Sequence, residues 1–140
     1  MFWKWGVSMK TYWVLSSSLL LGACATTGPV PANLKYEPHT LTEAQMASIK
    51  SVITRQLIDP GSAQFSEFRA RKVISQNGQG YQVCGHVNSK NRFGGYVGRR
   101  PFIGAFSPGA PEQFQLNSLP TAQFADSVYY ACNGLGLSLG

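Results

Sequence analysis

Charged residues are scarce in this chain, and acidic ones are the scarcest. Only 13% of its 140 residues are charged, with 6 Asp and Glu against 12 Lys and Arg, and it contains 2 histidines. So small a supply of acids and bases limits general acid–base catalysis. No serine stands in the glycine-flanked setting of a nucleophile elbow, which weakens any Ser–His–Asp triad drawn through His86 and Asp126. We therefore expect no catalytic residue, no cofactor and no enzymatic activity.

The chain also lacks a hydrophobic run long enough to remain in a membrane. The apolar stretch Tyr12–Leu21 has 10 residues, whereas a membrane-spanning helix needs about 20. A dense basic stripe is missing as well, because the formal charge of +6 is spread out and its tightest clusters are Arg69–Lys72 and Arg99–Arg100. A permanent membrane span and nucleic-acid binding by charge are both disfavoured.

What the chain does contain, at its N-terminus, is the three-part pattern of an export signal. The basic residue Lys10 precedes the apolar stretch, and the small residues Gly22 and Ala23 follow it. Residues 1–23 are therefore predicted to be a signal peptide. Met9 begins a complete signal by itself, so we expect it to be the true start of the protein.

The residues Leu21-Gly22-Ala23-Cys24 resemble a bacterial lipobox. That resemblance implies that lipid is attached to Cys24 and that the signal is cleaved just before this cysteine. The mature protein would then be held at the cell envelope by its lipid and face the periplasm. Ala25 stands where an Asp would resemble the inner-membrane retention signal of enteric bacteria, so the outer membrane is the expected location.

The chain has 3 cysteines, and a lipid on Cys24 leaves Cys84 and Cys132 as an even pair. In an oxidising compartment such a pair is expected to form a disulfide. The alternative is a metal site that combines these cysteines with His86 and His39. Structural zinc sites carry ligands paired at short spacing, and no such pair occurs here, so we predict the disulfide and no metal.

The mature chain divides into a tether and a folded part. The segment after Cys24, up to Thr40, carries 3 prolines and 1 glycine, which predicts a flexible tether over residues 24–40. Residues 41–140 are long enough for a single globular domain.

The domain is predicted to begin with a helix. Thr42 and Gln45 have the spacing of a capping box, and Asp59–Gly61 should end the helix. Between them, apolar residues recur at helical spacing and form one stripe that faces a core. Its members are Met46, Ile49, Val52, Ile53 and Leu57.

Two strands joined by a hairpin are predicted next. Residues 64–74 are extended, but Phe65 and Phe68 fall on opposite faces of a regular strand, so we expect a bulge or a switch of face between them. The dipeptide Asn77-Gly78 is a strong hairpin signal. Residues 81–88 then alternate between two faces, as a strand does.

A third strand is predicted over residues 96–106. Pro101 has no amide donor, so it should lie at a sheet edge or a bulge. Residues 121–132 are predicted to form a short helix capped by Asn133-Gly134, with a strand as the alternative because of Tyr129-Tyr130. The predicted fold class is therefore α+β, with an N-terminal helix on a small antiparallel sheet of about three strands, a C-terminal helix and one disulfide.

The most unusual segment lies between the second and third predicted strands, from Asn88 to Phe102. Its double glycine, Gly94-Gly95, allows close backbone approach, and its asparagines can bond to loop backbone groups. One interpretation is a self-capped architectural loop. The other is a binding loop that presents amide, guanidinium and aromatic groups. The candidate binding residues are Asn88, Asn91, Arg92, Tyr96, Arg99 and Arg100.

This part of the chain resembles a small domain of uncharacterised bacterial lipoproteins. The shared pattern runs D-P-x-S-x-x-F, here Asp59–Phe65, and then C-G-x-V-N-x-x-N-x-x-G-G-Y-x-G, here Cys84–Gly98. The resemblance covers about half of the mature chain. It implies no particular activity.

The expected function is that of a lipid-anchored envelope protein, a non-catalytic binding or accessory component. Its expected partners are the membrane, through the lipid, and an envelope protein or the peptidoglycan. One alternative is a small cell-wall-modifying hydrolase. Another is a phage- or plasmid-derived exclusion lipoprotein.

The lipobox generates the first prediction. Wild-type protein should begin at Cys24 and carry acyl chains, whereas Cys24→Ala should accumulate as unlipidated precursor or be released as soluble protein. The reason is that membrane affinity comes from burial of the acyl chains, at about 0.8 kcal/mol per CH₂ group. Mass spectrometry of the N-terminus and membrane fractionation measure this. A variant that stays membrane-bound and normally processed would overturn the lipoprotein assignment.

Overall fold

The computed structural model describes residues 33–140, so the predicted signal peptide, Cys24 and the first part of the predicted tether lie outside the described residues. The described elements are β1 (Lys35–Pro38), α1 (Glu43–Thr54), a 3-10 turn at Pro60–Ser62, β2 (Gln64–Ser75), β3 (Gly78–Asn88), β4 (Arg100–Ser107), β5 (Ala110–Ser118), a 3-10 turn at Ala122–Phe124 and α2 (Ala125–Gly134).

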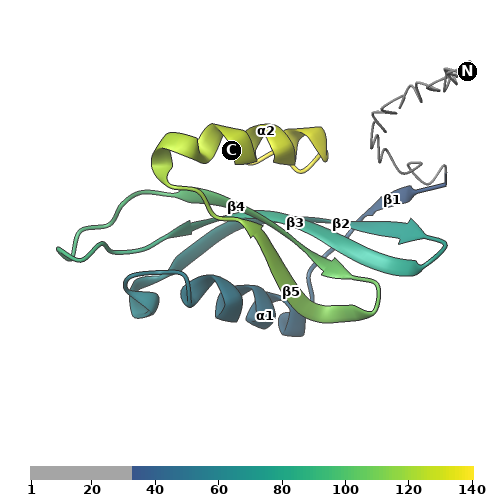
Figure 1. The fold of residues 1–140 in the computed structure, drawn as a ribbon, viewed down its shortest axis with the longest axis horizontal. Coiled ribbons are helices and arrows are strands. Elements are labelled where there is room, and N and C mark those ends of the chain that lie inside the picture. The colour runs from purple at the N-terminus through teal and green to yellow at the C-terminus, as the bar shows by residue number, and fades with distance from the viewer. Residues whose placement is uncertain (1–32) are drawn as a thin grey trace, which may run out of the picture.

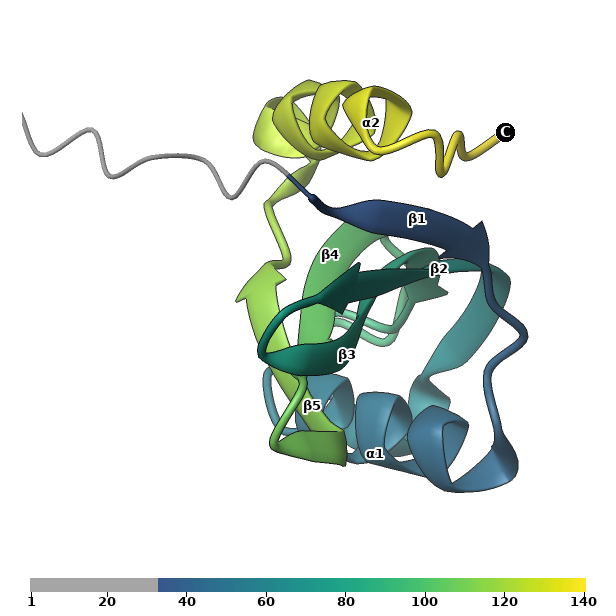
Figure 2. The same cartoon turned by 90° about the vertical axis from the view of Figure 1, so that its right-hand side faces the viewer.

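The strands form one antiparallel sheet in chain order, β1-β2-β3-β4-β5. Helix α1 lies against one face of this sheet and α2 against the other, which gives three layers (Figures 1 and 2). The α+β class with two helices and one disulfide is confirmed. The sheet, however, has five strands rather than about three.

The strand β1 lies where the composition predicts flexible tether. Its residues Lys35–Pro38 pair with Arg71–Ile74 of β2, so the folded part begins before residue 41 and the tether does not reach Thr40. An edge strand needs hydrogen bonds on one side only, which is why the proline at its end is tolerated. Proline content alone therefore did not separate a short edge strand from coil.

The other edge strand, β5, is also absent from the sequence prediction. Its apolar residues Phe114 and Leu116 alternate with amides and so give a weak strand signal. Two side chains of α1 form hydrogen bonds with backbone groups of β5. Phe114 N–H donates to Ser48 Oγ over 3.0 Å, and Gln45 Nε2 donates to the Pro111 carbonyl over 3.1 Å. These bonds shield β5 from pairing with another chain.

Helix α1 starts as predicted, with the capping box of Thr42 and Gln45 formed in both directions. It ends at Thr54, earlier than expected, and backbone turns carry the chain on to Pro60. From the predicted stripe, Ile49, Ile53 and Leu57 are buried. They pack against the phenylalanines of β4 and β5.

The core beneath α1 depends on two glycines that let rings lie against the sheet. A Cβ added to Gly104 would lie 2.2 Å from Phe114 Cζ, and one added to Gly85 would lie 2.6 Å from Phe102 Cζ. Side chains at these positions would therefore displace the rings. Phe106 packs 5.4 Å from Phe114 between ring centroids and completes the aromatic layer.

The predicted bulge in β2 is present. The register of β2 with β3 shifts between Ser66 and Arg69, and the intervening Glu67 has a φ of 53°. The hairpin is also present, with its turn at Gln76–Asn77 and Gly78 just after the turn at a φ of 113°. The sequence predicts the bulge and the hairpin because each depends only on residues that are neighbours in the chain.

The third predicted strand is shorter than expected and lies inside the sheet. It is β4, which begins at Arg100 and has β3 and β5 on its two sides, so Pro101 is not on an edge strand. The register of β4 with β5 begins only at Ile103. At Pro101, β4 therefore pairs with β3 alone. Because β5 does not pair with β4 at this position, the absence of an amide donor costs no hydrogen bond to β5.

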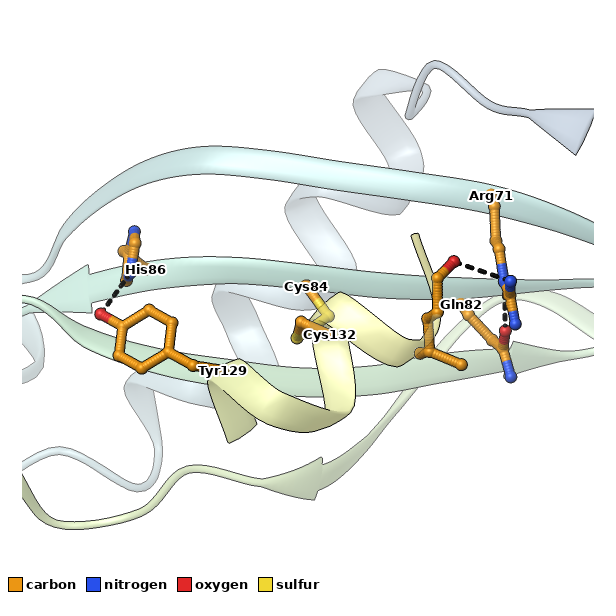
Figure 3. The surroundings of a disulfide bond; sticks show 7 residues. Arg71, Gln82, Cys84, His86, Tyr129 and Cys132 are labelled. Carbon is orange, nitrogen blue, oxygen red and sulfur yellow. Dashed lines mark hydrogen bonds between the residues drawn. A yellow bond between two sulfur atoms is a disulfide. The ribbon is translucent and has the colours of Figure 1, made fainter. Parts of the chain in front are cut away.

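The predicted disulfide joins Cys84 on β3 to Cys132 on α2 (Figure 3). Around it, Val128 and Leu137 form a small second core. Helix α2 begins at Ala125 rather than Thr121, and it includes Asn133 and Gly134, which were predicted to cap it; its C-cap is Leu135. After the helix the chain forms a turn at Gly136, which has a φ of 72°. In this turn Gly136 N–H donates to the Asn133 carbonyl and Leu137 N–H donates to the Cys132 carbonyl.

The disulfide generates the second prediction. It closes a sequence separation of 48 residues, so replacing both cysteines (Cys84→Ala with Cys132→Ala) should lower the free energy of unfolding by about 4 kcal/mol. Denaturant titration of the two proteins measures the difference. Reductant should destabilise the wild-type protein and leave the double variant unchanged. Equal thiol labelling of unfolded wild-type protein before and after reduction would contradict the bridge.

Candidate functional site

The predicted binding residues centre on the loop that joins β3 to β4, residues 89–99. This loop extends beyond the ends of the strands, at the end of the molecule opposite β1 (Figure 1). Arg92, Tyr96 and Arg99 lie on the loop and are exposed. Asn88 and Arg100 are half-buried at the ends of β3 and β4.

Asn91 holds the loop in shape through its own side chain. Its Oδ1 accepts hydrogen bonds from Phe93 N–H at 2.9 Å and Gly95 N–H at 3.1 Å. Its backbone N–H also donates to the Gly95 carbonyl at 2.8 Å, and Gly94 N–H donates to the Asn91 carbonyl at 3.0 Å. For Asn91 the architectural interpretation is therefore the one that the geometry supports.

The base of the loop is fastened to the rest of the domain. Lys90 N–H donates to Ser62 Oγ at 2.8 Å, and Val97 N–H donates to the Ser89 carbonyl at 3.1 Å. Tyr96 pairs with Lys90 across the loop, and its hydroxyl accepts a bond of 3.2 Å from Gln64 Nε2. The loop is thus tied at its base and braced at its tip.

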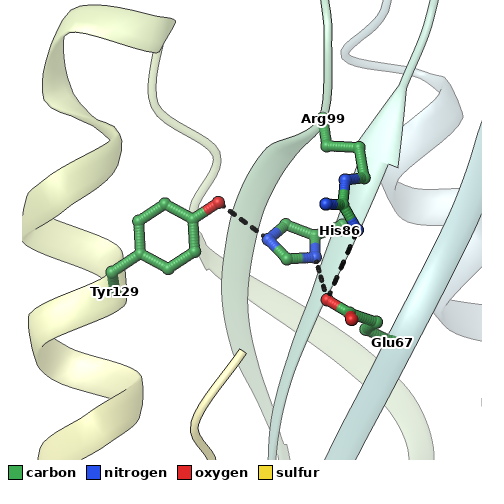
Figure 4. Close-up of polar contacts among 4 residues, drawn as sticks. All are labelled: Glu67, His86, Arg99 and Tyr129. Carbon is green, nitrogen blue, oxygen red and sulfur yellow. Dashed lines mark hydrogen bonds and ion pairs between the residues drawn. The ribbon is translucent and has the colours of Figure 1, made fainter. Parts of the chain in front are cut away.

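A polar cluster beside the loop escaped the sequence prediction (Figure 4). His86 Nε2 lies 2.8 Å from Tyr129 Oη, and His86 Nδ1 lies 2.8 Å from Glu67 Oε2. The second contact is short but lies off the direction of a regular hydrogen bond. Arg99 Nη1, on the loop, approaches the same carboxylate oxygen at 3.7 Å.

This cluster joins parts of the chain that are far apart in sequence. Glu67 comes from the bulge of β2, His86 from β3, Arg99 from the loop and Tyr129 from α2. No local sequence signal links them, although the bulge predicted between Phe65 and Phe68 does mark the position of Glu67. His86 is buried, and its Nε2 is hydrogen-bonded to Tyr129.

The buried position of the imidazole limits what the cluster can do. The side chain of His86 is 1% exposed, and its two nitrogens face Tyr129 and Glu67. A substrate has no open path to either nitrogen in this arrangement. The cluster therefore serves to hold the bulge, the loop and α2 together, while its exposed ion pair with Arg99 contributes about 1 kcal/mol or less.

A second set of polar contacts fastens the end of α2 to the sheet (Figure 3). Arg71 donates from Nε to Gln82 Oε1 and from Nη1 to the Leu135 carbonyl, each at 2.7 Å. Its guanidinium also lies 4.0 Å from the centroid of the Tyr36 ring. A cation at the C-terminal end of a helix is favourable because the last carbonyls there carry partial negative charge.

Next to these contacts is an open groove of about 750 Å³. It runs along β1 and the turn into α1, and it is closed on one side by the segment after α2. Arg71 and Tyr36 line one end, and Met46, Phe68 and Leu137 supply apolar walls.

The alternative metal site does not form. Cys84 and Cys132 are bonded to each other, so neither thiolate is free to bind a metal. His39 instead contacts Gln45 Oε1 at 2.9 Å and stacks on Tyr81 with a centroid distance of 4.2 Å. Within residues 33–140, no group of three or more His, Cys, Asp or Glu side chains is arranged to hold a metal ion.

Neither α1 nor α2 has the length and hydrophobicity that a membrane-spanning helix would need. Comparison of the chain with protein-family models, with curated proteins and with solved structures found no match.

The bracing of the loop generates the third prediction. Asn91→Ala removes the acceptor for the amides of Phe93 and Gly95, so their hydrogen exchange should be about fivefold faster, which corresponds to about 1 kcal/mol. Asn91→Asp keeps an oxygen acceptor and should keep exchange slow. Both melting temperatures should stay near that of wild type, because the loop lies outside the core. Equal exchange in the two variants would show that the side chain does not brace the loop.

Proposed function

We propose that this protein is a lipid-anchored, non-catalytic binding component of the cell envelope, and that its loop of residues 89–99 makes the contact. One observation carries the proposal. The guanidinium and aromatic groups of Arg92, Phe93 and Tyr96 are exposed on a backbone that is braced by Asn91. Side chains of these types dominate the binding energy of many interfaces.

Bracing matters because an ordered loop loses little conformational freedom when it binds. Ordering a flexible loop and its side chains subtracts from affinity, so a loop that is already held in place retains more of its contact energy. The hydrogen bonds of Ser62 and Gln64 at the base of the loop also hold it in place before it binds.

The position of the loop also suits an anchored protein. The described chain enters the domain at β1, and the loop lies at the other end of the sheet (Figure 1). A lipid on Cys24 would attach upstream of β1. The loop would therefore stay clear of the attachment point and be free to meet another envelope component, for which an envelope protein or the peptidoglycan was the expectation from sequence.

The fourth prediction tests the loop as a contact surface. Mature protein carrying Cys24→Ser, which removes the lipid attachment, is incubated with isolated envelopes, and its association is measured by sedimentation. Arg92→Ala and Tyr96→Ala should each weaken association about fivefold or more, which corresponds to a loss of about 1 kcal/mol. The free energy of unfolding of Arg92→Ala, obtained from thermal melts, should differ from that of wild type by less than about 0.5 kcal/mol, because the Arg92 side chain is exposed.

Matched controls come from exposed residues elsewhere. Tyr130→Ala on α2, where the ring is 83% exposed, and Arg55→Ala after α1 should leave association unchanged. If loop variants of normal stability associate as well as wild type, the loop is not the contact surface.

A further inference from the structure

The loop exposes apolar side chains that contribute to neither hydrophobic core, with Phe93 in the turn at its tip and Tyr96 and Val97 nearer its base. Phe93 is 89% exposed, Tyr96 47% and Val97 44%, and none of them belongs to the two buried clusters. Gly94 and Gly98 have open space where a side chain would begin. Contiguous exposed apolar side chains are unusual on a protein surface and mark a place of contact.

The charged residues within the segment from Asn88 to Phe102 are all basic. Lys90, Arg92, Arg99 and Arg100 lie in or beside the loop, and the sequence contains no Asp or Glu between Glu67 and Glu112. Glu67 itself lies near Arg99 at the base of the loop. The loop therefore carries exposed Arg92 beside exposed Phe93, with further basic residues toward its base, which complements a partner that is anionic at its surface and apolar beneath it.

The shape of the tip narrows the choice of partner. The loop protrudes from the sheet (Figure 1), and the groove along β1 includes no residue from 91 to 99. A protruding tip cannot enclose a sugar or a peptide. It can enter the headgroup layer of a lipid surface, which adapts to the tip, whereas a protein partner would need a pocket shaped to fit it.

We propose that the tip binds an anionic lipid surface. In this arrangement Phe93 and Val97 enter the boundary between headgroups and acyl chains, and Tyr96 lies at headgroup level, where aromatic residues with a polar end are favoured. Arg92 contacts a lipid phosphate, for which the planar guanidinium is well suited. This inference rests on the proposed role of the loop as a contact surface and specifies its partner.

The test measures partition of the Cys24→Ser mature protein onto protein-free vesicles. One set of vesicles is phosphatidylcholine alone, and the other contains about one-third phosphatidylglycerol. Wild type should bind the anionic set preferentially. Arg92→Gln should lower its partition coefficient about fivefold, as expected for one cation near an anionic surface. Phe93→Ala should lower it about tenfold or more, because a phenylalanine ring leaves the apolar layer.

A spectroscopic arm locates the tip directly. All 3 tryptophans of the chain, Trp3, Trp5 and Trp13, precede Cys24, so Phe93→Trp places a single indole in the mature protein. Its emission should shift to shorter wavelength on anionic vesicles and be quenched by brominated lipid. The control Tyr130→Trp, on exposed α2, should show neither change.

The controls Lys50→Gln and Tyr130→Ala should partition like wild type. Equal binding of wild type to both vesicle sets, or loss of partition in controls and tip variants alike, would overturn the lipid inference. If vesicles are not bound but association with envelopes still depends on the loop, the proposed function stands and the partner is a protein or peptidoglycan. If neither depends on the loop, both proposals fail.

Discussion

The bond between Cys84 and Cys132 is the constraint on which the position of α2 depends. The noncovalent core around it is small, with Val128 and Leu137 as the other buried members. Hydrophobic burial scales with area, so a cluster of this size stabilises the helix by only a few kcal/mol, similar to the contribution of the disulfide. With α2 in place, Tyr129 reaches His86 and the polar cluster beside the loop is complete.

The two faces of the sheet are therefore stabilised in different ways. Beneath α1, aromatic rings lie against glycines in a continuous apolar core, as Phe114 does over Gly104. Beneath α2, a covalent bond and polar contacts replace much of that packing, with Arg71 as one of them. A short chain with few large apolar residues on its second helix can still have three layers, because the disulfide supplies the constraint that packing does not.

The features that were predicted from the sequence are those that depend on residues close together in the chain. The capping box at Thr42 and the bulge near Glu67 each follow from residues within one turn or one strand. The edge strands β1 and β5 could not be predicted in the same way, since each becomes a strand only by pairing with a neighbour that has the stronger signal. The loop was identified from its composition, but the Glu67–His86–Tyr129 cluster depends on contacts across the whole fold, for which one sequence holds no signal.

Glu67 shows how the scaffold and the loop are coupled. It is the only residue other than glycine with a positive φ between residues 33 and 140, a conformation that costs about 1–2 kcal/mol. The surroundings must compensate for that cost, and the contacts of its carboxylate with His86 and Arg99 are the ones available to do so. The bulge aims the carboxylate at the base of the loop, while His86 links it to Tyr129 on α2. The orientation of the loop is therefore set by the sheet and by the disulfide-held helix together, and not by the loop sequence alone.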